Sequence, residues 1–215
     1  AISAVVAVGS IADPLVATLN HRARGLKIGP GSADGMDMGP LVTAAHRDRV
    51  ASYIDAGIKE GARLVVDGRD VKVSGHEAGF FLGPTIFDAV TPDMTIYKDE
   101  IFGPVLVVLR VETLDEGIDL VNPNPYGNGT AIFTNSGGAA EKFEDQVEVG
   151  MVGVNVPIPV PSAFYSCGGW KQSLFGDLDV YGTEGVAFYT RTKAVTTRWP
   201  KGDMVSSGFI MPTSS

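Results

Sequence analysis

The run Pro104-Val105-Leu106-Val107-Val108-Leu109-Arg110-Val111 is strongly apolar and predicts a β-strand in the middle of the chain. Directly after it, Thr113-Leu114-Asp115-Glu116 has the pattern of a capping box, in which a threonine and a glutamate three residues later satisfy free N–H groups at the start of a helix. The run Ile2 to Val8 is apolar and rich in β-branched residues, as a strand covered on both faces would be. These stretches predict strands that lead directly into helices.

The same alternation continues along most of the chain. Helices are expected after Asp13-Pro14, after Thr43 and after Ser136, where an N-cap residue precedes apolar residues at helical spacing. Further short strands are expected at residues 64–66, 85–87, 131–134 and 151–156. Strands that alternate with helices of about 10–15 residues predict the α/β class, with an open, twisted and largely parallel sheet.

The pattern changes after Asn155. In Val156-Pro157-Ile158-Pro159-Val160-Pro161 every second backbone N–H is missing, which excludes both a helix and a central strand. We therefore interpret residues 1–155 as one lobe and residues 156–185 as an extended return segment that crosses to another body. Residues 186–199, from Val186 to Trp199, form one β-prone run with no partner left in this sequence, and predict an oligomerisation strand that pairs with another chain. Residues 200–215 are expected to form a loose tail.

Composition excludes several classes of partner. The chain has 215 residues and a formal net charge of −8, which opposes binding to nucleic acid and to anionic membranes. Its longest apolar stretch is too short to span a bilayer, which needs roughly 20 residues. A single cysteine, Cys167, excludes an intrachain disulfide and favours a reducing, cytoplasmic setting (or the mitochondrial matrix in a eukaryote). The three histidines are scattered without ligand spacing, so no metal site is expected.

The first residues raise the question of completeness. The chain opens at Ala1 within a buried-strand pattern, without an initiator methionine or a basic leader. We therefore expect a fragment of a longer protein.

The segment Lys98-Asp99-Glu100-Ile101-Phe102-Gly103-Pro104-Val105 carries the functional argument. Taken alone, Glu100 reads as a surface carboxylate ahead of a core strand, and Phe102 as a core residue. The segment nevertheless resembles the E-x-F-G-P motif of the aldehyde dehydrogenase superfamily. Five further landmarks of that family follow in the same order: Leu114-Asp115-Glu116, Asn122 to Gly127, Ala131 to Thr134, Gly150 to Asn155, and Gly168-Gly169-Trp170-Lys171-Gln172-Ser173. The resemblance extends to Tyr189-Thr190 with Lys193 and Val195.

The resemblance implies roles for two residues. Glu100 looks like the carboxylate that accepts hydrogen bonds from the nicotinamide ribose of NAD, and Phe102 like the aromatic residue that contacts the nicotinamide end. Such contacts suit hydride transfer, where holding the reacting groups close supplies much of the rate. The fold implied is the catalytic domain of that family, with the N-terminal cofactor domain absent from this chain.

Within the superfamily, the chain is most similar to the CoA-acylating, methylmalonate-semialdehyde type. The signs are Asn124 to Ala131, the Val-Pro alternation and Phe175-Gly176-Asp177. That type implies a cysteine thioacyl intermediate and coenzyme A as the acyl acceptor, with acetyl-CoA or propionyl-CoA as product. It also implies a homo-oligomer, assembled through Val186 to Trp199.

The departures from the family pattern limit the site. The family's nucleophilic cysteine lies in a stretch expected just upstream of Ala1, so no catalytic residue is expected in this chain. Cys167 is not its equivalent: it stands where relatives usually place a phenylalanine that lines the substrate mouth, and a lone cysteine is more often buried and inert. Two alternatives stay open, a hydrolytic aldehyde dehydrogenase with another substrate and a noncatalytic oligomerisation or binding module.

Overall fold

The computed structural model describes residues 2–197 and 199, and its centre is a four-stranded sheet in the order β1-β4-β3-β2. Strand β1 (Ala4–Val8) pairs in parallel with β4 (Val105–Val111), and β4 in parallel with β3 (Thr85–Asp88). Strand β2 (Arg63–Val66) adds to β3 in the antiparallel sense. The predicted α/β class and largely parallel sheet are confirmed.

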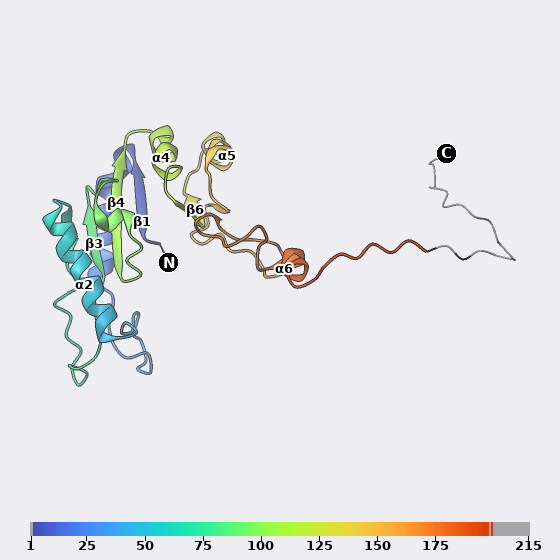
Figure 1. The fold of residues 1–215 in the computed structure, drawn as a ribbon. Helices are drawn as coiled ribbons and strands as arrows, with labels where there is room; N and C mark the ends of the chain where they lie inside the picture. The colour runs from blue at the N-terminus through green and yellow to red at the C-terminus, as the bar shows by residue number, and fades with distance from the viewer. Residues whose placement is uncertain (1, 198, 200–215) are drawn as a thin grey trace.

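Helices cover both faces of this sheet, and the side chains of β4 explain the layering (Figure 1). Because successive side chains of a strand point to opposite faces, Val107 and Leu109 join one buried cluster and Val108 joins another. The first cluster is covered by α2 (Ala44–Lys59) and α3 (Thr95–Lys98), and the second by α1 (Ala12–Arg24). The uninterrupted apolar character of β4 is thus the consequence of burial on two sides.

Side-chain caps begin three of the helices as the sequence predicts. Thr43 Oγ1 accepts the N–H of His46 at 3.1 Å before α2, and Thr113 Oγ1 that of Glu116 at 3.2 Å before α4 (Leu114–Val121). Ser136 Oγ accepts the N–H of Ala139 at 3.3 Å before α5 (Gly137–Gln146). Each cap satisfies an N–H that the first helical turn leaves without a partner.

Helix α1 begins earlier than the sequence predicts. A short 3₁₀ turn, η1 (Gly9–Ile11), continues directly into the helix at Ala12, so Asp13 lies in the first turn and is not the cap. Pro14 is tolerated there because the first helical N–H groups need no intrahelical partner. The carboxylate of Asp13 instead pairs with Arg110 at 2.8 Å, which ties the helix to the end of β4.

A buried carboxylate fastens the end of β3 to its neighbours. Asp88 is fully buried, and its oxygens accept hydrogen bonds from Arg110 at 2.9 and 2.8 Å and from Arg63. Burial alone would raise the pKa of Asp88, but these guanidinium groups and the N–H of Ala89 outweigh it and lower that pKa to about 2. The pairing is necessary because an ionised group without partners is costly to bury.

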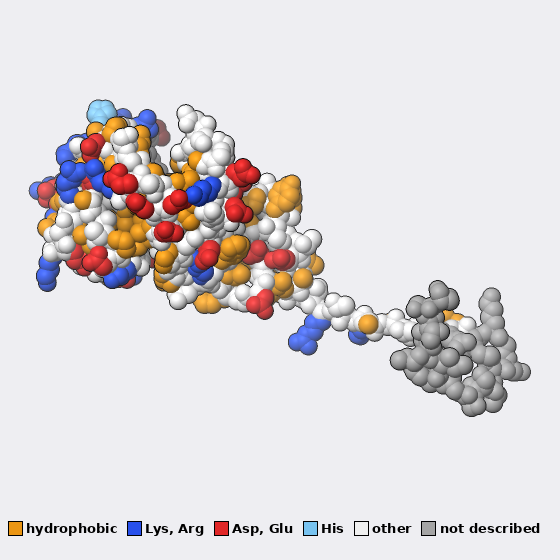
Figure 2. Space-filling view, turned by 90° about the horizontal axis from the view of Figure 1, so that it is seen from above, with side chains coloured by type: hydrophobic (Ala, Val, Ile, Leu, Met, Phe, Trp, Pro, Cys, Tyr) orange, Lys and Arg blue, Asp and Glu red, His pale blue; other side chains and the backbone are white. Residues whose placement is uncertain are grey.

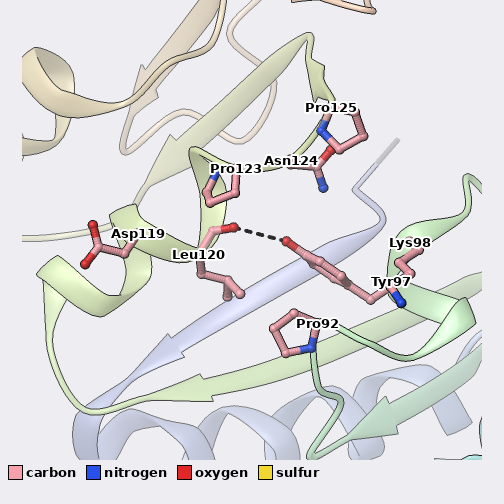
Figure 3. Close-up of a pocket in the computed structure, with 8 residues that line it drawn as sticks. All are labelled: Pro92, Tyr97, Lys98, Asp119, Leu120, Pro123, Asn124 and Pro125. Atoms are coloured by element: carbon pink, nitrogen blue, oxygen red, sulfur yellow. Dashed lines mark hydrogen bonds between the residues drawn. The ribbon is translucent and has the colours of Figure 1, made fainter.

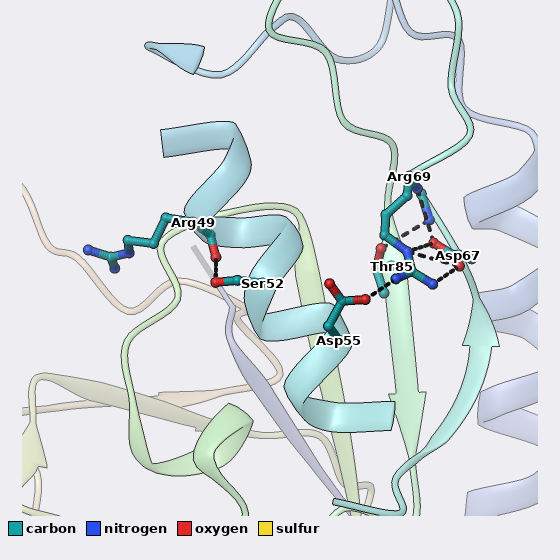
Figure 4. A network of polar contacts seen from close by, with 7 residues as sticks. Arg49, Ser52, Asp55, Asp67, Arg69 and Thr85 are labelled. Carbon is teal, nitrogen blue, oxygen red and sulfur yellow. Dashed lines mark hydrogen bonds and ion pairs between the residues drawn. The ribbon is translucent and has the colours of Figure 1, made fainter. Parts of the chain in front are cut away.

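A second polar cluster links α2 to the connection between β2 and β3 (Figure 4). The guanidinium of Arg69 contacts Asp67 and Asp55 at 2.5 Å each, and the N–H of Gly68 donates to Thr85 Oγ1 at 3.0 Å. Hydrogen bonds from Arg69 lower the pKa of Asp67. This cluster satisfies polar groups at the point where the connection leaves β2.

The rest of the lobe is a smaller unit beside the main sheet. Strands β6 (Gly129–Ile132) and β7 (Met151–Val154) pair in parallel, and Ile118, Phe143, Val147 and Val149 form a third buried cluster with the helices α4 and α5. A pair of two-residue strands, β5 (Tyr126–Gly127) and β8 (Trp170–Lys171), attaches the chain beyond residue 155 to this unit.

The residues after Asn155 leave the lobe as an irregular, largely exposed chain (Figure 1). The prediction of a strand throughout 186–199 is wrong at its start, because Val186 to Phe188 lie in helix α6 (Gly182–Phe188). Without a partner strand, a helix satisfies the backbone of these residues by local bonds. Residues 189–197 have no regular structure, and the tail expected at 200–215 lies outside the described residues. None of the helices described has the length and apolar character needed to cross a bilayer.

Candidate functional site

The loop Asp99–Pro104 lies at the amino edge of the main sheet. It leads directly into β4, and the carbonyl of Pro104 accepts the N–H of Thr85 at the start of β3, at 2.8 Å. Because β1 runs parallel to β4, its first residues lie at the same edge, and the carbonyl of Ser3 accepts the N–H of Val107 at 3.1 Å. The loop that holds the sequence motif and the first described residues of the chain therefore share one edge of the sheet.

The side chains of this loop separate into an inward anchor and two outward groups. Ile101 is buried in the cluster beneath α2, whereas Glu100 is exposed and 74% of Phe102 is accessible to solvent. The assignment of Phe102 to the core on its own chemistry is thus wrong. A ring so exposed and a carboxylate two residues away are available to a ligand.

The backbone at Phe102 is strained. Its φ is +56°, in the left-handed region that an aromatic residue rarely adopts and that costs of order 1–3 kcal/mol. The next residue has to be glycine for a separate reason: a Cβ at Gly103 would lie 2.6 Å from a methyl group of Val50, which is fully buried. The close approach of helix α2 to Gly103 and the burial of Ile101 hold the backbone of Phe102 from both sides.

Two polar residues of α2 bond to the same loop. Arg49 Nη2 donates to the carbonyls of Glu100 at 3.1 Å and Ile101 at 3.4 Å, and the Tyr53 hydroxyl donates to Asp99 Oδ2 at 3.0 Å. That hydrogen bond to a carboxylate raises the pKa of Tyr53. Arg49 lies on the exposed side of α2, and these bonds direct its guanidinium toward the loop. Its spacing from Tyr53, four residues along one helix face, is the signal that could have paired the two.

The region around Cys167 is a separate candidate site. The half-buried Cys167 lines a cavity of about 460 Å³ together with Asn128, Met151, Tyr181 and the glycines Gly168 and Gly169. None of the residues that line this cavity comes from the loop Asp99–Pro104. The described chain therefore does not bring Cys167 into the same cavity as Glu100 and Phe102.

A smaller cavity of about 320 Å³ lies between α3 and the turn after α4 (Figure 3). Its lining includes Tyr97 and Lys98, which immediately precede the loop, and three prolines, Pro92, Pro123 and Pro125. The hydroxyl of Tyr97 donates to the carbonyl of Leu120 at 3.3 Å, across the cavity. This bond connects the α3 end of the loop to the neighbouring unit.

The loop suits the ribose and nicotinamide of a dinucleotide. A carboxylate is an acceptor for two adjacent hydroxyl donors, and an exposed aromatic ring offers a flat face to a heteroaromatic ring. Glu100 and Phe102 present these groups from one rigidly held loop, so the residues present fit that part of the cofactor. Among residues 2–197 and 199, no three or more His, Cys, Asp or Glu side chains are grouped to hold a metal ion.

Fold and loop together define an α/β domain that exposes a carboxylate and an aromatic ring at the amino edge of a parallel sheet. The chain belongs to the aldehyde dehydrogenase family, whose pattern it matches over residues 1–195.

Three similar proteins carry the names of malonate- or methylmalonate-semialdehyde dehydrogenases. Over 99% of this chain, malonate-semialdehyde dehydrogenase of Pseudomonas aeruginosa is 59% identical, and the bovine mitochondrial methylmalonate-semialdehyde/malonate-semialdehyde dehydrogenase [acylating] is 50% identical. The matched parts are 43% and 40% of those proteins, so the chain spans about two-fifths of their length. The crystal structure of a putative methylmalonate-semialdehyde dehydrogenase from Sinorhizobium meliloti complexed with NAD superposes with a TM-score of 0.92 at 52% identity. That superposition covers 94% of this chain and 42% of the other.

Proposed function

We propose that this chain is the C-terminal part of an NAD-dependent, CoA-acylating aldehyde dehydrogenase, and that its loop Asp99–Pro104 holds the nicotinamide half of NAD. One observation carries the proposal: Glu100 and Phe102 stand exposed on a loop whose backbone is strained at Phe102 and pinned from α2. Strain of this kind persists where the surroundings enforce it, and it concentrates at ligand sites. The relatives complexed with NAD support the choice of cofactor.

In the proposed site each residue has a distinct task. The carboxylate of Glu100 accepts hydrogen bonds from the two ribose hydroxyls and so fixes the sugar. The ring of Phe102 packs against the nicotinamide end and limits its rotation. Ile101 anchors both in the core, which keeps their separation constant. Holding the ring in one orientation is what brings its reacting carbon to the aldehyde.

The names of the relatives support malonate or methylmalonate semialdehyde as the substrate. In the proposed reaction a cysteine outside this chain binds the aldehyde carbon and becomes thioacylated as NAD accepts the hydride. The substrate carboxylate is lost as carbon dioxide. Coenzyme A accepts the acyl group from the cysteine, which gives acetyl-CoA or propionyl-CoA. For Cys167 the family resemblance supports a place at the wall of the substrate mouth, although the cavity that it lines here includes no residue of the loop Asp99–Pro104. The setting is a reducing compartment, cytoplasmic or mitochondrial.

The proposal extends to assembly. The missing cofactor domain is expected to meet the amino edge of the sheet, where the loop lies. The residues from Tyr189 to Trp199 that follow α6 are expected to pair with a neighbouring subunit of a homo-oligomer, since long β-prone segments without a partner add to exposed sheet edges.

The test is an NAD titration of the full-length enzyme by fluorescence. Glu100→Gln is expected to weaken NAD binding about 10–100-fold, the loss of hydrogen bonds to a charged acceptor. Glu112→Gln is the matched control, because Glu112 is also exposed but lies beyond the opposite end of β4. Equal NAD affinity in the two variants would contradict the proposed site.

The acyl acceptor needs its own measurement. With coenzyme A present, the product from malonate semialdehyde is expected to be acetyl-CoA. A free acid formed at the same rate with and without coenzyme A would identify a hydrolytic enzyme instead. Absence of any NAD reduction by the full-length protein would favour a noncatalytic module.

A further inference from the structure

We propose that Arg49 and Tyr53 are positioning residues, which hold the loop Asp99–Pro104 in the one conformation that turns Glu100 and Phe102 toward the cofactor. This inference rests on the proposed function, because it concerns the same NAD site. It adds Arg49 and Tyr53, which lie about 50 residues earlier in the chain, to the residues of that site. Arg49 bonds to backbone carbonyls of the loop and Tyr53 to Asp99, so the side chains of Glu100 and Phe102 remain free to meet the cofactor.

Arg49 fixes the part of the loop before Phe102. Its Nη2 donates to two successive carbonyls, those of Glu100 and Ile101, so it sets the orientation of the two peptide planes that lead into Phe102. The guanidinium also lies 5.8 Å from the ring centre of Tyr53, within the range of a cation–π contact. A planar group with several fixed donors can hold two acceptors at once, which a lysine does less well.

Tyr53 and Val50 fix the two ends of the same loop. The Tyr53 hydroxyl donates to Asp99 Oδ2 at 3.0 Å, one residue before Glu100. Val50 packs where Gly103 lacks a side chain, one residue after Phe102. One face of α2 thus contacts the loop on both sides of Phe102, whose side chain remains free to meet a ligand.

These contacts explain how a strained backbone is kept. A left-handed Phe102 is disfavoured, and the loop would relax to an ordinary conformation if it were not held from both sides. Relaxation would turn the ring and shift Glu100. Because Arg49 is exposed and Tyr53 half-buried, their bonds add little to the stability of the core, and their effect falls on the local geometry.

The experiment compares Arg49→Met with Arg47→Met in the full-length enzyme. Arg47 lies on the same helix, and its guanidinium bonds to Asp48 at 2.7 Å. Arg49→Met is expected to weaken NAD binding about 5–20-fold, measured by fluorescence titration, while Arg47→Met retains wild-type affinity. Arg49→Lys is expected to recover part of the loss, and Tyr53→Phe to weaken NAD binding about 2–5-fold. The melting temperature without NAD is expected to change by less than about 3 °C in all four variants.

A double variant tests whether Arg49 affects NAD binding by positioning Glu100 or only by stabilising the protein. If Arg49 acts through the loop, its loss matters less once Glu100 can no longer bind, so the effects of Arg49→Met and Glu100→Gln on NAD affinity are expected to be less than additive. Full additivity, or an Arg49→Met affinity equal to that of Arg47→Met, would overturn the inference. Glu100→Gln with wild-type affinity would instead overturn the proposed function, so the two failures are distinguishable.

Discussion

The sheet lobe and the chain after Asn155 are both rich in apolar residues, yet they bury them very differently. In the lobe, Phe87 and Val108 are completely buried, whereas beyond Asn155 Phe175 is 96% and Tyr189 86% exposed. Figure 2 shows hydrophobic side chains at the surface of the narrower part that leads away from the lobe. Apolar composition indicates that a segment will be buried, but only the topology decides whether the covering surface lies in the same chain. The lobe covers itself, and the segment after Asn155 is expected to be covered by another body.

The largest expected effect tests this comparison with one aromatic residue from each region. Phe87→Ala removes a fully buried ring and is expected to cost roughly 3–5 kcal/mol of unfolding free energy. Phe175→Ala, at an exposed ring of this chain, is expected to change it by less than about 0.5 kcal/mol. Urea unfolding of the isolated 215-residue chain measures both. A large effect of Phe175→Ala there would mean that the segment packs onto the lobe.

The next effect concerns the buried charge of the lobe and depends on pH. Because the pKa of Asp88 is lowered to about 2 in the folded state, its contribution is present above about pH 4 and is lost as the pH falls toward 2. That contribution is about 2 kcal/mol. Asp88→Asn is expected to reduce stability at pH 7 and to flatten its decline between pH 4 and pH 2.

The control for this titration is an exposed ion pair. Asp48→Asn removes the partner of Arg47, a carboxylate whose side chain is 64% exposed, and is expected to cost less than about 0.5 kcal/mol. Urea midpoints between pH 2 and pH 7 compare the two variants. Equal pH profiles of the two variants would show that Asp88 contributes no more to the pH dependence of stability than an exposed carboxylate does.

A smaller effect tests the strained loop. Phe102→Gly and Phe102→Ala both delete the ring, and both are expected to weaken NAD binding. Only glycine adopts a positive φ freely, so Phe102→Gly is expected to be about 1 kcal/mol more stable than Phe102→Ala. Thermal unfolding in the absence of NAD measures the difference. Equal melting temperatures would argue against strain at this position.

The smallest effect concerns the attachment between the two regions. Lys171 Nζ donates to the carbonyls of Asn122 at 2.6 Å and Asn124 at 3.3 Å, beside the short β5–β8 pair. Lys171→Met is expected to accelerate thermolysin cleavage within residues 156–185 roughly 2–5-fold, since local opening becomes easier while the core is unchanged. Lys142→Met, which removes a surface ion pair with Asp115, is expected to leave cleavage unaffected. Identical cleavage of both variants would mean that Lys171 does not hold the segment.

Much of the fold follows from local chemistry. Thr43, Thr113 and Ser136 mark helix starts because each offers an oxygen to the first turn, and β4 is recognisable because both of its faces are buried. The short elements do not follow, because α3 has four residues and β5 and β8 two each, too few to show a period. Val186 to Phe188 are β-prone but helical, since the strand they favour needs a partner that the sequence does not reveal.

The candidate site divides in the same way. Glu100 and Phe102 are recognisable from a motif of adjacent residues. The proposed role of Arg49 is not recognisable from the sequence. Its two acceptors are backbone carbonyls 51 and 52 residues away, and because every residue has a carbonyl, residue types do not reveal which one is bound. The exposure of Phe102 also cannot be predicted from its residue type, because a lone aromatic residue is normally assigned to the core.

The parallel pairing of β1 with β4 has a consequence for biosynthesis. Ala4 pairs with Val107, so about a hundred residues are translated between strand β1 and its neighbour β4. At roughly 5–20 residues per second this interval is on the order of 5–20 s, during which β1 lacks its β4 neighbour. Contacts so distant along the chain also slow folding. The edge of the sheet that bears Glu100 and Phe102 is therefore expected to form only after β4 has been translated, later than helices α1 and α2, whose hydrogen bonds are local.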